Sequence, residues 1–195
     1  MLENEIKRYR SLNRLAAADG IVIFGCAEDT DIPLGELKQA FALDDNIYNR
    51  SVESISITDA SEVYDECISE LCPETVILHI GDSDVKLFAE APADFEACYV
   101  GLIEKIREKD KDRRIVIVSL KNSRDDKTLT DLNKRLRYIA ESQRCDFEDI
   151  SSPIARTPRK TREIVEFLHS TGFVHPLKNK RPIYDLVRIL FCYGD

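Results

Sequence analysis

Three short apolar runs rich in β-branched residues constrain the fold of this chain more than any other feature. They cover residues 21–24, 75–80 and 114–120. Continuous apolar runs of this length are typical of strands that are buried on both faces, as in a parallel sheet. Longer amphipathic stretches separate the three runs, and this alternation predicts an α/β fold with helices on both faces of a central sheet.

The remaining segments complete the predicted order of elements. Two weaker strands are expected at 46–49 and 146–150, and helices are expected at 6–18, 34–41, 61–71 (with Ser61 as N-cap), 92–108, 128–144, 159–169 and 182–192. We therefore predict a three-layer αβα sandwich with a flavodoxin-like parallel sheet of about five strands. With 195 residues and no internal repeat or linker, residues 1–195 are expected to form a single domain. Ligands of such sheets bind outside the carboxyl ends of the strands.

Charge and composition narrow the possible partners. The net charge of −8 disfavours nonspecific binding to nucleic acid, because phosphate repels an acidic chain. The basic run Arg156–Arg162 is an exception, explained either by a solvated loop and helix start or by an anionic partner. No apolar stretch approaches the roughly 18 residues of a membrane span, and residues 1–5 lack a secretory apolar core, so we expect no membrane association and a cytoplasmic location.

The cysteines and histidines predict no metal site and no cofactor. The six cysteines are scattered, and although Cys67 and Cys72 are close in sequence, no second pair or histidine cluster completes a zinc pattern. His79 lies within a predicted central strand and is expected to be a hydrogen-bonded core residue. Acidic residues follow two strands and form either a solvated rim or a site for a hard cation through oxygen ligands; this rim contains Glu28, Asp29, Asp82, Ser83 and Asp84.

Five segments, in order, resemble the conserved blocks of the GDSL/SGNH hydrolase family. They are residues 12–25, ending in Ile-Phe-Gly; 47–54, containing Asn-Arg; 73–84, ending in Gly-Asp-Ser-Asp; 145–150; and 172–176, Gly-Phe-Val-His-Pro. The resemblance covers nearly the whole chain. It implies a serine nucleophile, a histidine base oriented by an aspartate three residues earlier, and an oxyanion hole built from backbone N–H groups and an asparagine.

Several residues that this chemistry requires are absent at the matching positions. The resemblance places Cys26 and Ala27 where the family has its Asp-Ser, and alanine carries no nucleophilic atom. The oxyanion glycine is replaced by Ser54, the oxyanion asparagine by Ser83 and the orienting aspartate by Gly172. His175 is retained, but it lacks its carboxylate partner. The vestigial catalytic positions are therefore Ala27, Ser54, Ser83, Gly172 and His175.

Three functions remain open on the sequence alone. The first is a catalytically inactive pseudo-hydrolase that binds a small ligand or a protein partner in the crevice at the strand ends. The second is an active esterase or acyl transferase of altered mechanism that uses Cys26, or another group near His175. The third is a different flavodoxin-like protein that binds a nucleotide or phosphate, although no Gly-rich phosphate loop follows the first strand. Cys26 itself is expected to be a buried structural thiol, because neighbouring residues leaving a strand point to opposite sides.

Overall fold

The strands of this computed structural model form one parallel sheet, as predicted. The structure describes residues 2–122, 126–151 and 182–193. The sheet has five strands in the order β2-β1-β3-β4-β5. Their bounds are β1 Ile21–Gly25, β2 Ile47–Asn49, β3 Thr75–His79, β4 Arg114–Val118 and β5 Asp146–Glu148. All four strand pairs are parallel, so the loops that follow the strands gather at one edge.

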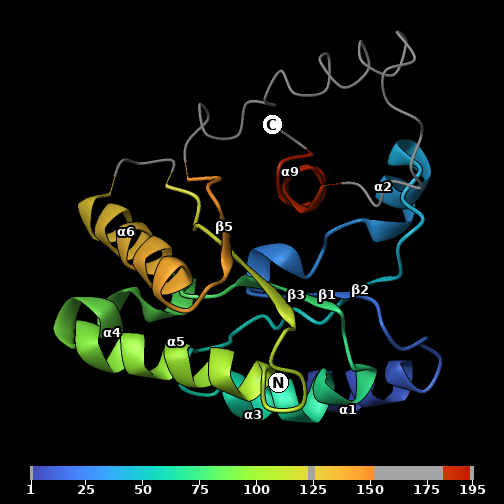
Figure 1. Ribbon diagram of the computed structural model, residues 1–195, viewed down its shortest axis with the longest axis horizontal. Coiled ribbons are helices and arrows are strands. Elements are labelled where there is room, and N and C mark those ends of the chain that lie inside the picture. The colour runs from blue at the N-terminus through green and yellow to red at the C-terminus, as the bar shows by residue number, and fades with distance from the viewer. Residues whose placement is uncertain (1, 123–125, 152–181, 194–195) are drawn as a thin grey trace, which may run out of the picture.

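Helices cover both faces of this sheet (Figure 1). One face carries α1 (Leu2–Asn13), α3 (Ala60–Cys67), α4 (Val85–Glu90), α5 (Pro92–Ile106) and α6 (Lys127–Ser142). The other face carries α2 (Leu34–Phe41) and α9 (Ile183–Phe191). The expected helix at 159–169 lies outside the described residues.

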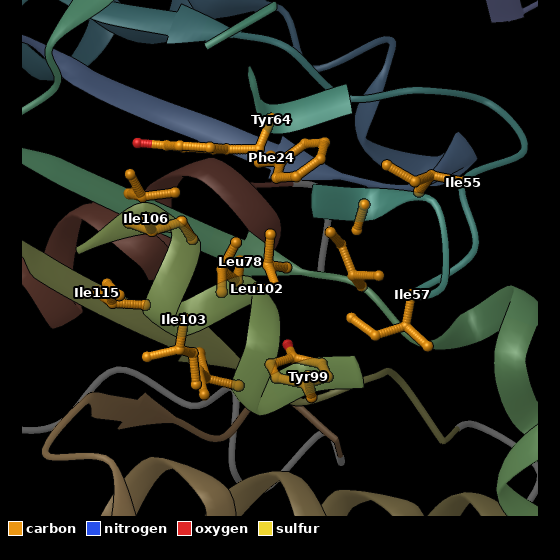
Figure 2. Packing of buried hydrophobic residues seen from close by; sticks show 14 of the residues in the cluster. Phe24, Ile55, Ile57, Tyr64, Leu78, Tyr99, Leu102, Ile103, Ile106 and Ile115 are labelled. Carbon is orange, nitrogen blue, oxygen red and sulfur yellow. The ribbon is translucent and has the colours of Figure 1, made fainter. Parts of the chain in front are cut away.

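Each helical layer shares a separate hydrophobic core with the sheet. Alternate strand residues point to opposite faces. Phe24 and Leu78 therefore pack with Tyr64 and Leu102 in the larger core, part of which is shown in Figure 2. Ile23, Ile77 and Val116 point the other way and pack against α9. Both faces of the central strands are buried, which explains why their sequences are almost continuously apolar.

Several helix boundaries differ from the prediction, most of all at α1 and α3. Helix α1 ends at Asn13, not at residue 18, because the Asn13 side chain donates to the carbonyl of Cys67 and the chain then turns through Asp19 in a left-handed conformation (φ 63°). Ser61 is not an N-cap, since α3 already begins at Ala60. This helix ends at Cys67, and a separate 3₁₀ turn, Ser69–Leu71, follows it. Helix α4 was not predicted; it is a helix of only 6 residues, too short to show a clear period.

Candidate functional site

The chain leaves β1 through a tight 3₁₀ turn, Ala27–Asp29, at the edge where the loops gather. Within this turn the side chains alternate between interior and solvent. Cys26 is buried and belongs to the larger core, whereas Ala27 and Glu28 are exposed. The expectation that Cys26 is a buried thiol is confirmed. The residue at the nucleophile position, Ala27, presents only a methyl group to solvent.

The carboxylate of Asp29 folds back over the end of β1 and binds the neighbouring strand. Its Oδ2 accepts a hydrogen bond from the Cys26 backbone N–H (3.0 Å) and lies 2.9 Å from Nδ1 of His79. Gly25 and His79 are paired in the β1–β3 register. A Cβ on Gly25 would overlap the Asp29 carboxylate, so only glycine leaves room for this contact. Both Asp29 and His79 are almost fully buried.

Polar side chains fasten the loops of this edge to one another. Asn49, at the end of β2, donates from Nδ2 to the Asp29 carbonyl (2.6 Å) and so holds the turn after β1. Asp84, after β3, accepts from the Ser56 hydroxyl (2.7 Å) and the Ile57 backbone N–H (3.0 Å) of the loop after β2. Together with the Asp29–His79 contact, these bonds connect the ends of β1, β2 and β3.

The vestigial positions that the structure describes lie on these connected loops. Ala27 follows β1, Ser54 follows β2 and Ser83 follows β3, and all three are exposed. Gly172 and His175 lie outside the described residues, as does the basic run 156–162. The convergence of Ala27, Ser54, Ser83 and His175 on one cleft therefore stays a prediction.

The Cys26 thiol is poorly suited to act as a nucleophile. Burial raises its pKa to about 12, and the nearby Asp29 carboxylate contributes to the increase. The thiol donates to Oδ2 of Asp29 at 3.8 Å, which is the same oxygen that contacts His79. The hydrogen-bond partner of the thiol is thus a carboxylate and not an imidazole base. A thiolate is the nucleophilic form of cysteine, and this environment disfavours it.

The acidic rim divides into groups with different roles. Glu28, Asp82 and Ser83 are exposed, whereas Asp29 and Asp84 are buried and bound to partners within the chain. Burial also raises the pKa of Asp84, although the hydrogen bonds from Ser56 and Ile57 oppose the increase. These five residues do not present their oxygens as one cluster toward a hard cation.

A cavity of about 270 Å³ adjoins the turn after β1 on the side covered by α9. Its wall contains acidic and basic side chains together with aliphatic and aromatic ones. The lining side chains are Glu28, Asp29, Ile32, Lys121, Leu190, Phe191 and Tyr193. Ala27, Ser54 and Ser83 do not contribute to this wall. The cavity is slightly smaller than typical ligand pockets and suits a ligand of few heavy atoms.

Sequence reasoning anticipated a hydrogen-bonded His79 but not its partner. Asp29 and His79 are 50 residues apart in sequence, and their contact depends on the β1–β3 register. Asn49 was likewise not singled out as the residue that holds the turn after β1. One available signal was the position of Gly25, because a glycine at the end of a buried strand often marks a close approach of another group.

Among the helices that the structure describes, none combines the length and apolar character needed to cross a bilayer.

Comparison with known proteins yields structural neighbours only. No protein family model and no curated protein sequence matches the chain. A Streptococcus pneumonia protein, provisionally assigned as a platelet activating factor, superposes with a TM-score of 0.65 at 17% identity, covering 78% of each chain. A GDSL-like lipase from Bacteroides thetaiotaomicron has a TM-score of 0.56 at 15% identity, covering 86% of this chain and 96% of the other.

An esterase of the SGNH-hydrolase family, AlinE4, superposes with a TM-score of 0.53 at 16% identity and covers 80% of this chain and 94% of its own. The strand order, the layers and these superpositions agree with the resemblance seen in the sequence. The chain has the fold of the GDSL/SGNH hydrolases.

Proposed function

We propose that this protein is a pseudo-hydrolase, which uses a GDSL/SGNH-type scaffold to bind a small ligand or a protein partner without hydrolysing it. The observation that carries the proposal is the exposed methyl group of Ala27 at the end of β1, where the resemblance requires a serine hydroxyl. Acyl transfer to a hydroxyl cannot begin at a residue that has none.

The surroundings of Ala27 support the same conclusion. The adjacent thiol of Cys26 is buried and held protonated, so it does not replace the missing hydroxyl. His79 is the one described histidine in this region, and its Nδ1 is engaged by Asp29. The loops are nevertheless well fastened to one another, and the cavity beside Glu28 combines Lys121 with apolar walls. A rim that is ordered but lacks a nucleophile fits binding better than turnover.

Ester hydrolysis by the purified protein tests the proposal. We expect p-nitrophenyl acetate and p-nitrophenyl butyrate to be hydrolysed no faster than in buffer, with or without prior alkylation by iodoacetamide. Turnover that alkylation abolishes would instead favour a thiol enzyme. Turnover that resists alkylation would reveal another nucleophile, and either result would overturn the proposal.

A restoring variant tests whether the scaffold is that of a silenced hydrolase. The variant combines Ala27→Ser, Ser54→Gly, Ser83→Asn and Gly172→Asp and keeps Cys26, because an aspartate there would face the Asp29 carboxylate. We expect detectable hydrolysis of short-chain esters. The matched control carries the other three substitutions but retains Ala27, and it should stay inactive. A folded quadruple variant with no activity would contradict the assignment of the vestigial positions.

Binding is tested with probes that fit the cavity. Acetate and butyrate place a carboxylate opposite Lys121 and a short apolar chain against Phe191 and Leu190. We expect one of them to raise the melting temperature of the wild type and to have less effect on Lys121→Ala. Lys134→Ala, which removes an exposed lysine on α6, serves as the control. Equal responses of all three proteins would count against a ligand site in this cavity.

A further inference from the structure

Three side chains with metal-binding atoms meet in the interior beside the turn after β1. They are Cys26 and Asp29 of the turn and His79 of β3, and their exposed fractions are only 3%, 3% and 2%. One ligand atom from each, a sulfur, a carboxylate oxygen and a ring nitrogen, lies within 4.8 Å of the other two. The sequence predicted no metal site, because no second cysteine pair and no histidine cluster accompanies Cys67 and Cys72.

The separations of these atoms resemble those around a tetrahedral metal ion. Oδ2 of Asp29 lies 2.9 Å from Nδ1 of His79 and 3.8 Å from Sγ of Cys26. Typical zinc bonds of about 2.0–2.3 Å in tetrahedral geometry place ligand atoms roughly 3.3–3.6 Å apart. Shifts of a few tenths of an ångström would bring the two distances from Asp29 into this range, and the sulfur and the ring nitrogen, which lie within 4.8 Å of each other, would move together around the ion.

The balance of charge in the interior also fits a divalent cation. A thiolate, a carboxylate and a neutral imidazole together carry two negative charges, which one divalent ion neutralises. Binding converts the Cys26 thiol to a metal-bound thiolate and releases its proton to solvent. Sulfur and imidazole ligands select zinc-type ions over magnesium and calcium, which prefer oxygen.

His79 provides a second, independent observation. Its Nε2 is buried and has no hydrogen-bond partner. An unsatisfied buried polar atom costs roughly 1–3 kcal/mol. Among the described residues, the polar contact of the buried His79 ring is therefore made through Nδ1 to Asp29, on the side of the cluster.

We propose that Cys26, Asp29 and His79 form a binding site for a zinc-type divalent cation. Asp29 also lines the cavity of about 270 Å³, so a water molecule entering from that side can complete a fourth coordination position. The ion would join the turn after β1 to β3, directly beside Ala27. This site does not depend on the proposed function, since binding is measured without any ester substrate.

Cobalt binding tests the site, because a cobalt–thiolate bond has a distinct absorption spectrum. The full-length protein is stripped with EDTA and titrated with Co²⁺ alone. We expect a near-ultraviolet thiolate charge-transfer band and visible ligand-field bands of a tetrahedral site, saturating at one ion per chain. Added Zn²⁺ should displace Co²⁺ and abolish both the charge-transfer band and the ligand-field bands. Absence of these bands, or their saturation only at several ions per chain, would overturn the proposal.

Variants assign the site to the three residues. Cys26→Ser should lose the charge-transfer band, and Asp29→Asn and His79→Gln should each weaken Zn²⁺ affinity at least tenfold. Cys72→Ser removes an exposed cysteine outside the cluster and should bind as the wild type does. Circular dichroism identifies variants that fail to fold, and Cys26→Ser, the smallest change, decides the case if the others do not fold. A charge-transfer band that survives in Cys26→Ser or disappears in Cys72→Ser would place the metal elsewhere.

The displaced proton gives a further readout. Since the Cys26 thiol is protonated in the metal-free protein, we expect Zn²⁺ affinity to rise about tenfold per pH unit between pH 6 and 8, beyond the behaviour of Cys26→Ser. Equal pH dependence of the wild type and Cys26→Ser would also contradict the site.

Discussion

The carboxylate of Asp29 occupies the space that a side chain on Gly25 would need, and from there it reaches Nδ1 of His79 on the next strand. The turn after β1 therefore does more than connect β1 to α2. It carries a buried acid that joins two central strands at the edge where the fold places its chemistry. The absent side chain of Gly25 makes this contact possible.

Gly25→Ala tests this relationship. The new methyl group would displace the Asp29 carboxylate from its contact with His79, and we expect the free energy of unfolding to fall by roughly 1–3 kcal/mol. Urea unfolding followed by circular dichroism measures the change. Gly101→Ala is the matched control, because a Cβ at this position in α5 meets no other atom. It should leave stability unchanged or raise it by up to about 1 kcal/mol. Equal effects of the two variants would show that Asp29 can move freely.

The cysteines should differ strongly in their rate of alkylation. Burial raises the pKa of Cys26 to about 12 and that of Cys67 to about 11, whereas Cys72 is exposed. In native, metal-free protein at pH 8 we expect iodoacetamide to label Cys72 well before Cys26 or Cys67. Peptide mass spectrometry after timed quenching gives the order in which the cysteines are alkylated. Labelling in urea gives the reference rates for the unfolded chain. Rapid labelling of native Cys26 would reveal a reactive thiol in the turn after β1.

The ion pair between Glu148 of β5 and Arg188 of α9 should contribute to the attachment of α9. Its closest atoms are 2.8 Å apart, and the two side chains are only 6% and 14% exposed. Breaking a buried ion pair by removing one partner is costly, so Glu148→Ala should destabilise the protein by roughly 3 kcal/mol.

Asp131→Ala is the comparison for Glu148→Ala, because it breaks the exposed Lys134–Asp131 pair of α6 and should cost less than about 1 kcal/mol. Both effects are measured by urea unfolding. A loss for Glu148→Ala no larger than that for Asp131→Ala would show that the buried pair adds little to the attachment of α9.

Asp84 should make the protein less stable as the pH rises from about 4 toward neutrality. Burial raises the pKa of this carboxyl in the folded state, so the folded chain binds its proton more tightly than the unfolded chain does. The unfolded state then holds fewer protons in the window above its own pKa, and stability declines as the pH increases through the folded pKa.

Asp84→Asn removes this titration. We expect the free energy of unfolding of the wild type, relative to that of Asp84→Asn, to decrease between pH 4 and pH 7 in urea titrations. Asp44→Asn, which changes an exposed carboxyl that does not contribute to the pKa of Asp84, should leave the wild-type pH dependence in place. A constant difference between the wild type and Asp84→Asn would mean that Asp84 titrates alike in both states.

The sequence by itself determined the sheet and the residue type at position 27. Runs such as 75–80 and 114–120 are apolar at most of their buried positions, with Thr75, His79 and Ser119 as the exceptions, so their strand character follows largely from local composition. The chemistry available at position 27 is equally local, because an alanine has no side-chain oxygen in any fold. Helix ends were harder to predict from the sequence. Helix α1, for example, ends where the Asn13 side chain donates to the carbonyl of Cys67, which is distant in the sequence.

Only the tertiary structure decided which polar groups meet. Asp29 and His79 are 50 residues apart, and Asp84 and Ser56 are 28 apart; each pair forms because parallel strands bring their carboxyl ends to one edge. The strand register places Gly25 opposite His79, and the missing Cβ leaves room for a carboxylate between them. Residue types fix which bonds are chemically possible, but register and burial select those that form, because they set the distance and the solvent access of each group.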